Sequence, residues 1–396
     1  MKSTMRSEAM PGTLARPRSD RYIFIACPWT EKGGGMFKVA DYLLQAQDTA
    51  SVPETAAHLR SLDTRGGGGA VYSLWVLFTA LMQIVRGRFS GRLAGVHVNM
   101  AERLSLFRKS VIIVASRLLG IPVVLHLHAA QLHHFYPRLL KPLQAMTRWV
   151  FSLPESCVVL GKTAERFVVE DLKVPQSRVE IVINGVPAPT VQRRRPAKDA
   201  VKRLLFVGNL SERKGVSDLL QTLTLPGFED LNIELVFAGG GDVQAYQAKA
   251  RDLGIEKLVR FAGWSEQKEV ARLMALADVL VLPSYDEGLP LVILEALANG
   301  VAVVCSPVGE IPSVLRHGLT ACFVDPGDIN GLAATLQQVL REPELMETLE
   351  RNGQELYEKA FSLPRFFSSI ARIHKRCFGV SGQSATSGAF SKDEAS

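Results

Sequence analysis

Short apolar, β-branched runs alternate with helical stretches along most of this chain, stop once, and then start again. The first half carries such runs at 22–27, 95–98, 122–126, 157–160 and 179–183. The second half carries them at 203–207, 233–238, 259–261, 279–282, 302–305 and 322–324. Strands that alternate with helices are typical of a parallel sheet covered by helices on both faces. The sequence therefore predicts two doubly wound α/β domains with a cleft between them.

The interruption between the two halves indicates where the domains meet. After residue 186 the chain reads Pro-Ala-Pro and then a polar run without apolar periodicity, so we predict a linker over 189–200 between domains at 21–188 and 201–360. The basic lead 1–20 contains no apolar core of a secretory signal, and the tail 379–396 is rich in Ser, Gly and Ala. Both ends are predicted to be disordered.

Charge and cysteine content restrict the class of protein. The chain has 46 Lys and Arg against 39 Asp and Glu, a net charge of +7 that suits phosphate-bearing partners or an anionic membrane surface. Its five cysteines are scattered and form no C-x-x-C pair, which favours a reducing, cytoplasmic location without a disulfide framework or a zinc site. The most apolar stretch, 71–85, is about fifteen residues long, too short to span a bilayer, and is predicted to be a buried helix.

The strongest motif follows the predicted strand at 279–282. It reads DEGLPLVILEA over 286–296 and opens a helix. A helix N-terminus preceded by glycine offers backbone amides and a partial positive charge, which suit a diphosphate. Glu287 and Glu295 are separated by about 12 Å of helix rise, too far to act on one atom but close to the length of a nucleotide-sugar folded over its diphosphate.

In this Glu-Gly-x-Pro context the chain resembles the retaining GT-B glycosyltransferases of glycosyltransferase family four, the bacterial glycosyl transferases group 1. The resemblance extends over about 22–377 and includes VGNLSERKG at 207–215, AGGGD at 238–242, FAGW at 261–264, NGVAVV at 299–304 and DPGD at 325–328. It implies two Rossmann-like domains, an acceptor side in the first and nucleotide-sugar binding in the second. It also implies that 361–378 forms a helix crossing back to the first domain.

The resemblance places the donor diphosphate in the loop after the first strand of the second domain. Lys214 matches the lysine of the family's basic pair, and a lysine there makes sense as a point charge on a phosphate. Asn209 stands where the family usually has arginine. Either Arg213 replaces part of that charge or the leaving group is held more weakly. Gly288, Leu289, Pro290 and Leu291 are expected to contribute backbone to the same site.

Other donor-binding residues are assigned by the same resemblance. Gly240 lies in a glycine run that permits close approach of a ligand. Trp264 fits two interpretations, stacking on the nucleobase or packing in the core. Gly34 and Gly35 belong to a glycine-rich loop near the first strand, and their spacing is not the G-x-G-x-x-G fingerprint of NAD binding.

Two histidines end the predicted strand at 122–126. Strand alternation places His126 and His128 on one face and Leu127 on the other. No third ligand has recognisable spacing, so no metal is expected. The family commonly has a histidine here that faces the donor sugar, and His128 matches it better than His126. Glu287, Lys214 and His128 are thus the predicted catalytic group.

Basic residues are interleaved with apolar ones at 138–150 and again around Arg86, Arg88 and Arg92. This pattern suits either an interfacial helix on anionic lipid or an ordinary amphipathic helix of the domain. A peripheral location on the inner face of the plasma membrane is therefore one expectation, beside a purely cytoplasmic one.

The implied function is transfer of a sugar, with retention, from a nucleotide-diphosphate sugar to a hydroxyl of a glycan or lipid-linked glycan, as in bacterial surface polysaccharide assembly. No cofactor, metal or nucleic acid is expected. A nucleotide-sugar epimerase or a phosphorylase of the same fold remains an alternative. A non-catalytic sugar-nucleotide-binding subunit is another, because of Asn209 and of Glu310, where the family often has glycine.

Overall fold

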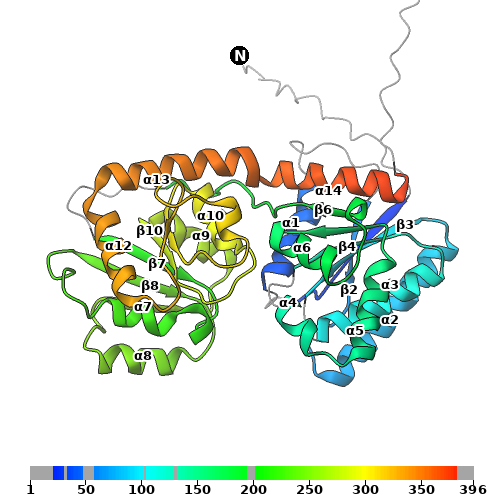
Figure 1. Ribbon diagram of the computed structural model, residues 1–396, viewed down its shortest axis with the longest axis horizontal. Coiled ribbons are helices and arrows are strands. Elements are labelled where there is room, and N and C mark those ends of the chain that lie inside the picture. Colours follow the sequence, from blue (N-terminus) through cyan, green and yellow to red (C-terminus); the bar gives the residue numbers. More distant parts are fainter. Residues whose placement is uncertain are drawn as a thin grey trace, which may run out of the picture.

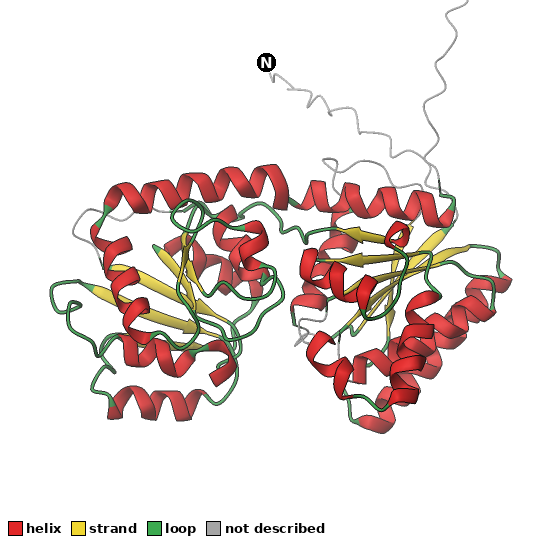
Figure 2. Cartoon of the chain, viewed as in Figure 1, coloured by secondary structure: helices red, strands yellow, loops and turns green. Residues whose placement is uncertain are grey.

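The computed structural model describes residues 21–30, 34–47, 58–101, 104–128, 132–193 and 201–380. It contains two six-stranded parallel sheets, each covered by helices, arranged as two lobes side by side (Figures 1 and 2). The predicted fold class, two Rossmann-like domains, is confirmed. The predicted lead 1–20 and nearly all of the tail 379–396 lie outside the described residues.

The first sheet has the strand order β2-β1-β3-β4-β5-β6. Its strands are β1 (Tyr22–Cys27), β2 (His58–Asp63), β3 (Leu93–Met100), β4 (Val123–Leu127), β5 (Ser156–Val159) and β6 (Val179–Ile181). Its helices are α1 (Gly35–Ala46), α2 (Ala70–Phe89), α3 (Leu104–Leu118), α4 (Leu132–Phe135), η1 (Tyr136–Arg138), α5 (Lys141–Ser152), α6 (Lys162–Glu170) and η2 (Gln176–Arg178).

The edge strand β2 escaped the sequence prediction for a physical reason. Only Leu59 and Leu62 of its six residues are buried, because an edge strand with one covered face needs little apolar surface. The inner strands β1, β3 and β4 are buried at every residue and were found at their predicted positions, with bounds differing by at most two residues.

The second sheet has the order β12-β11-β10-β7-β8-β9. Its strands are β7 (Lys202–Val207), β8 (Ile233–Ala238), β9 (Val259–Gly263), β10 (Val279–Leu282), β11 (Ala302–Cys305) and β12 (Cys322–Phe323). Its helices are η3 (Glu212–Lys214), α7 (Val216–Thr222), α8 (Val243–Asp252), α9 (Gln267–Leu276), α10 (Leu291–Ala298), α11 (Ile311–Val314), α12 (Ile329–Arg341) and α13 (Pro343–Leu356).

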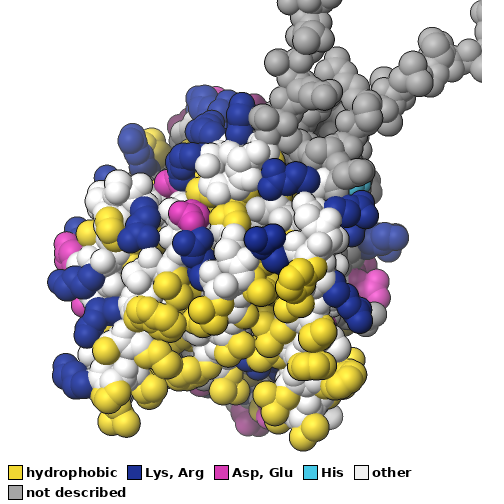
Figure 3. Space-filling model, turned by 90° about the vertical axis from the view of Figure 1, so that its right-hand side faces the viewer, with side chains coloured by type: hydrophobic (Ala, Val, Ile, Leu, Met, Phe, Trp, Pro, Cys, Tyr) yellow, Lys and Arg dark blue, Asp and Glu magenta, His cyan; other side chains and the backbone are white. Residues whose placement is uncertain are grey.

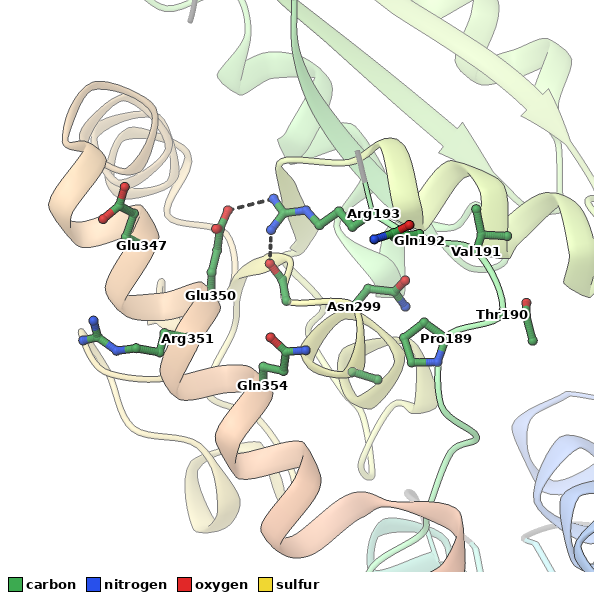
Figure 4. A pocket seen from close by; sticks show the side chains of 12 residues that line it. Pro189, Thr190, Val191, Gln192, Arg193, Asn299, Glu347, Glu350, Arg351 and Gln354 are labelled. Atoms are coloured by element: carbon green, nitrogen blue, oxygen red, sulfur yellow. Dashed lines mark hydrogen bonds and ion pairs between the residues drawn. The ribbon is translucent and has the colours of Figure 1, made fainter. Parts of the chain in front are cut away.

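The segment between the two sheets is anchored to the second domain by Arg193. Its Nη2 lies 2.7 Å from Glu350 Oε1 of α13, and its Nη1 donates to the Gly300 carbonyl. Figure 4 shows the guanidinium between these two partners, at the edge of a hollow of about 750 Å³ between the segment, α10 and α13. Residues 194–200 of the predicted linker lie outside the described chain.

The end of the chain joins the two domains. Helix α13 packs on the second domain, and a π-helical turn, η4 (Tyr357–Phe361), leads into α14 (Leu363–Phe378), which packs on α1 and β4 of the first domain (Figure 1). Beside this turn the Leu363 amide donates to the Val186 carbonyl at 3.0 Å, which ties the crossing point to the end of the first domain. The crossing helix thereby fixes how the two sheets face each other.

The prediction that 71–85 forms a buried helix is wrong in one respect. The helix exists as α2, but one side of it is open: Leu74 is 65% exposed, Trp75 61% and Phe78 51%. Its other side packs on the sheet through residues such as Val76 and Ala80. Composition showed that the stretch is apolar, but it did not show which side is covered.

Candidate functional site

The predicted catalytic residues meet between the two domains. His128, directly after β4, and Glu287, in the loop between β10 and α10, line one small cavity together with His133, Gly288 and Glu310. Residues just beyond the carboxyl ends of parallel strands form the ligand crevice in doubly wound sheets. The sequence placed these residues after strands; the structure brings them together from opposite domains.

The Glu-Gly-x-Pro loop is held by close backbone packing. Gly309 has φ +60°, and a Cβ on it would lie 1.9 Å from the Glu287 carbonyl oxygen, so only glycine fits there. The next amide, of Glu310, donates to the Gly288 carbonyl at 3.0 Å. These contacts fix the backbone that leads into α10.

Helix α10 begins at Leu291, with Pro290 at its N-cap in an extended conformation. The first amides of a helix have no acceptor within it, so this end can bind an anion. Gly35 of the first domain approaches the same place: a Cβ on it would lie 3.7 Å from Leu291 Cδ1. Gly34 precedes it as the N-cap of α1. Gly34 and Gly35 therefore lie opposite the start of α10, and their role in donor binding stays a prediction.

Lys214 and Glu287 form a buried ion pair, with side chains 13% and 10% exposed. Lys214 ends η3, and the following Gly215 has φ +67° and packs against the Pro283 carbonyl, which holds this turn against the Glu-Gly-x-Pro loop. Arg213 is exposed, and its Nη1 donates to the Asp286 carbonyl at 2.6 Å. Both basic residues thus lie at the loop that precedes α10.

Asn209, Gly240 and Trp264 form one corner of the second domain. A Cβ on Gly240 would lie 3.8 Å from Asn209 Oδ1 and 3.9 Å from Trp264 Cδ1. Trp264 is 54% exposed, so the interpretation of this residue as core packing is wrong. The exposed indole beside glycine is accessible to a flat ligand, and its stacking on the nucleobase stays a prediction.

Glu295 is held by the first domain. Its Oε1 accepts from Lys38 Nζ and from the Tyr42 hydroxyl, each at 3.2 Å, and Gln267 Nε2 donates to the same hydroxyl at 3.1 Å. Burial, and then the Glu295 charge, raise the pKa of Tyr42. A hollow of about 540 Å³ opens beside these residues, between the end of the first domain and α9. Glu295 therefore contributes to the contact between the domains.

His128 belongs to a line of four imidazoles that runs inward from the cavity. His374 Nε2 of α14 lies 2.9 Å from His97 Nδ1, and His97 Nε2 lies 3.3 Å from His126 Nδ1. The His126 and His128 rings are 4.0 Å apart, on the same strand face as predicted. Burial lowers the pKa of His97 to about 3 and lowers the pKa of the other three below the ordinary range.

The proton on His128 is assigned by its partner. Its Nε2 lies 2.8 Å from Oδ1 of Asn99, an oxygen that can only accept. With this orientation of the Asn99 amide, neutral His128 carries its proton on Nε2, and Nδ1 is the acceptor. Its backbone amide donates to the Met100 carbonyl at 2.8 Å, which fixes the residue at the sheet edge.

Sequence reasoning missed several residues of this region. Asn99 and His97 are polar residues in a fully buried strand, and polar residues within an apolar run are the signal in the sequence that points to them. Lys38 and Tyr42 contact a carboxylate more than 250 residues away, which no local pattern reveals. Glu310, noted as a departure from the family, accepts from the Ala164 amide at 2.9 Å and so caps α6 of the other domain.

No group of three or more His, Cys, Asp or Glu side chains within the described ranges is arranged to hold a metal ion. Metal independence of the activity is a separate matter and stays a prediction.

Comparison with known proteins assigns the second domain to a family. Residues 189–356 match the model of the family described as glycosyl transferases group 1. The second domain is a group 1 glycosyltransferase domain. It contains Lys214, Glu287 and Glu295, so the resemblance predicted from the sequence is confirmed at the level of this family.

Two relatives show how far the group 1 likeness extends. An uncharacterized glycosyltransferase of Methanocaldococcus jannaschii is 28% identical over 245 residues, 58% of this chain and 62% of that protein. The D-inositol 3-phosphate glycosyltransferase of Thermobispora bispora is 33% identical over 220 residues, 50% of this chain and 51% of that protein. The chain thus spans about half to three fifths of the length of these curated relatives.

Solved structures of glycosyltransferases share the whole fold. Sucrose-phosphate synthase from Thermosynechococcus elongatus has a TM-score of 0.71 at 19% identity, covering 91% of this chain and 100% of that one. HepE of Anabaena, solved with UDP and glucose, has a TM-score of 0.69 at 16% identity, covering 89% and 99%. At these identities the likeness establishes the GT-B fold of this chain, and nothing finer.

Proposed function

We propose that this protein is a metal-independent, retaining glycosyltransferase that moves a sugar from a nucleotide-diphosphate sugar to a hydroxyl acceptor. The observation that carries the proposal is the meeting of His128 and Glu287 at one interdomain cavity, with Lys214 paired to Glu287. These are the three residues that the family resemblance assigns to the reacting end of the donor.

The second domain would bind the nucleotide. Trp264, exposed beside Gly240, offers a flat surface for the base, and Glu295 offers carboxylate oxygens for the ribose hydroxyls. Lys38 and Tyr42 both donate hydrogen bonds to Glu295 Oε1 in this structure. When a nucleotide binds, its ribose hydroxyls would either replace these donors or bind the carboxylate alongside them. The diphosphate would then lie at the amides that open α10.

Charge that develops on the leaving diphosphate would be stabilised by Lys214, by Arg213 and by the amides at Gly288 to Leu291. Groups already oriented toward developing charge in a partly buried site are the largest source of rate acceleration in many enzymes. Released from its pair with Lys214, Glu287 would hold the donor sugar. His128, with Nδ1 as acceptor, can take a hydrogen bond from a sugar hydroxyl.

Retention would follow a front-face path. A leaving phosphate oxygen would accept the proton of the acceptor hydroxyl as the new glycosidic bond forms and the bond to the phosphate breaks. The acceptor would be a lipid-linked or growing bacterial surface polysaccharide, and the enzyme would work peripherally at the inner face of the plasma membrane.

A donor screen tests this function. The purified protein is incubated with a panel of nucleotide-diphosphate sugars and a lipid extract, and products are identified by mass spectrometry. We expect one donor to release its nucleoside diphosphate together with a glycosylated acceptor. An epimerase would convert the donor without acceptor, and a non-catalytic binding subunit would leave every donor intact; either result contradicts the proposal.

A further inference from the structure

The first domain presents an apolar surface built from three neighbouring helices. On α2 it includes Leu74, Trp75 and Phe78, all more than half exposed. On α3 it includes Val111 and Leu118, 43% and 83% exposed, and on α5 it includes Met146 and Trp149, 38% and 52% exposed. We call these seven residues the apolar face.

The apolar face is continuous. Helix α3 packs between α2 and α5, and the Trp75 and Phe78 rings lie 5.8 Å apart. Figure 3 looks onto this side of the molecule, where hydrophobic side chains gather over the lower part and Lys and Arg side chains border them. Large contiguous apolar patches with a polar rim mark interaction sites.

Helix α2 is, by length and composition, the one described helix that could cross a membrane. Its packing shows instead that one side of the helix lies on the sheet of the first domain. Ser73, Val76, Ala80 and Gly87 recur along the side that lies on the sheet, and a Cβ on Gly87 would lie 2.6 Å from the Tyr22 hydroxyl. The helix is therefore part of the domain and presents only its other side outward, as an interfacial helix does.

The charge around the apolar face identifies what covers it. Residues 63–155, which contain all three helices, carry eleven Lys and Arg and three Asp and Glu, a net charge of +8 against +7 for the whole chain. Of these, Lys109 is buried and Arg117 is paired with Glu155. Helices α2, α3 and α5 contain no acidic residue. A second copy of the chain would bring two such charged surfaces together, which repulsion disfavours, whereas anionic lipid headgroups are attracted.

We propose that the apolar face docks this protein onto an anionic lipid bilayer, with Trp75, Phe78 and Trp149 inserted among the acyl chains and the surrounding basic residues on the headgroups. Aromatic rings and arginines are suited to that boundary. The face is linked to the cavity by one segment, since α4 and η1 lead from His133 at the cavity to Leu140 at the start of α5.

This inference supplies the surface on which the lipid-linked acceptor of the proposed function would be met. The biological purpose of the docking rests on the proposed function, but the docking itself does not. Vesicle binding is measured without donor or acceptor, so failure of the docking leaves the proposed activity standing, and loss of activity leaves the docking standing.

The first test is co-sedimentation with vesicles of phosphatidylcholine alone or mixed with phosphatidylglycerol. We expect at least tenfold stronger partition onto the anionic vesicles, weakened by 0.5 M salt because salt screens surface charge. The variant Trp75→Ser/Phe78→Ser removes exposed apolar groups, and Arg86→Gln/Lys141→Gln removes exposed charge; each should lower binding about tenfold. Leu319→Ser, an exposed apolar residue of the second domain, is the matched control and should bind as wild type does.

The second test locates the contact. Two single-tryptophan proteins are made by changing the other three tryptophans to Phe, one keeping Trp75 and the other keeping Trp264, which is 54% exposed on the second domain. Brominated lipids should quench Trp75 and leave Trp264 unquenched. Equal quenching of both, or no binding to anionic vesicles, would overturn the proposal. So would a dimer in sedimentation velocity that Phe78→Ser abolishes.

Discussion

Lys38 Nζ lies 3.2 Å from Glu295 Oε1, so the first turn of α1 and the middle of α10 are joined by an ion pair between the two domains. The carboxylate that the family resemblance assigns to the ribose is thus also a contact between domains. The two roles predict different effects on nucleotide binding when Glu295 is replaced and when Lys38 is replaced.

Replacing Glu295 by Ala should weaken binding of the donor's nucleoside diphosphate by about 1–3 kcal/mol, the range for hydrogen bonds to a charged group. Replacing Lys38 by Met breaks the same ion pair but leaves the carboxylate, so affinity should stay within about threefold of wild type. Isothermal titration calorimetry of both variants distinguishes the roles. Equal losses in the two would show that Glu295 acts only as a domain contact.

His128→Ala should lower kcat strongly and leave nucleoside diphosphate affinity near wild type, because its interactions with the donor sugar would form only in the reacting complex. His126, fully buried two residues earlier on the same strand face, is the comparison: His126→Ala should lower the melting temperature instead. If His126→Ala loses activity in a folded, stable protein and His128→Ala does not, the role at the donor sugar belongs to His126 instead of His128.

The four imidazoles predict instability in acid. Their pKa values are lowered in the folded state, chiefly by burial, so below about pH 6.5 the unfolded chain binds protons that the folded chain does not. Above that pH the contribution of the four neutral histidines to the free energy of unfolding should therefore be fully present. It should fall as the pH drops toward 3, by up to about 1.4 kcal/mol per pH unit for each histidine.

Urea denaturation between pH 4.5 and 7.5 checks this slope. His97→Gln removes one of the buried groups and should reduce the pH dependence, although the variant starts from a lower stability. A His97→Gln slope equal to that of wild type would refute the assignment of acid sensitivity to this cluster.

Activity should persist in excess chelator. The basic groups at Lys214 and Arg213 would take the place of a metal at the diphosphate, and no D-x-D motif stands in the sequence. Turnover is compared with and without EDTA after dialysis. Complete loss that manganese or magnesium restores would contradict this prediction.

Much of the fold was accessible from the sequence because inner strands of a parallel sheet are covered on both faces and must be apolar throughout. That rule located β1, β3 and β4 and passed over β2, where two buried leucines suffice. The prediction for α2 was wrong for another reason: an apolar helix has the same composition whether one side or both sides are covered.

The candidate site could be predicted only as separate motifs. Glu287 and Lys214 were each visible through glycine and proline neighbours that set the local backbone, and their pairing needed the fold. Contacts that cross the domains, such as Glu310 on the Ala164 amide, join residues 146 positions apart and leave no periodic signal. The acid-sensitive histidine cluster likewise combines two strands with the final helix.

The central claim, that the donor diphosphate is bound between Lys214 and the start of α10, is tested most directly by calorimetric titration of the donor's nucleoside diphosphate. Lys214→Met should weaken binding about tenfold or more, since a hydrogen bond to a charged group contributes about 1.5–3 kcal/mol. Lys257→Met, at an exposed lysine of the same domain, should bind as wild type does. Unchanged affinity in Lys214→Met would contradict the account.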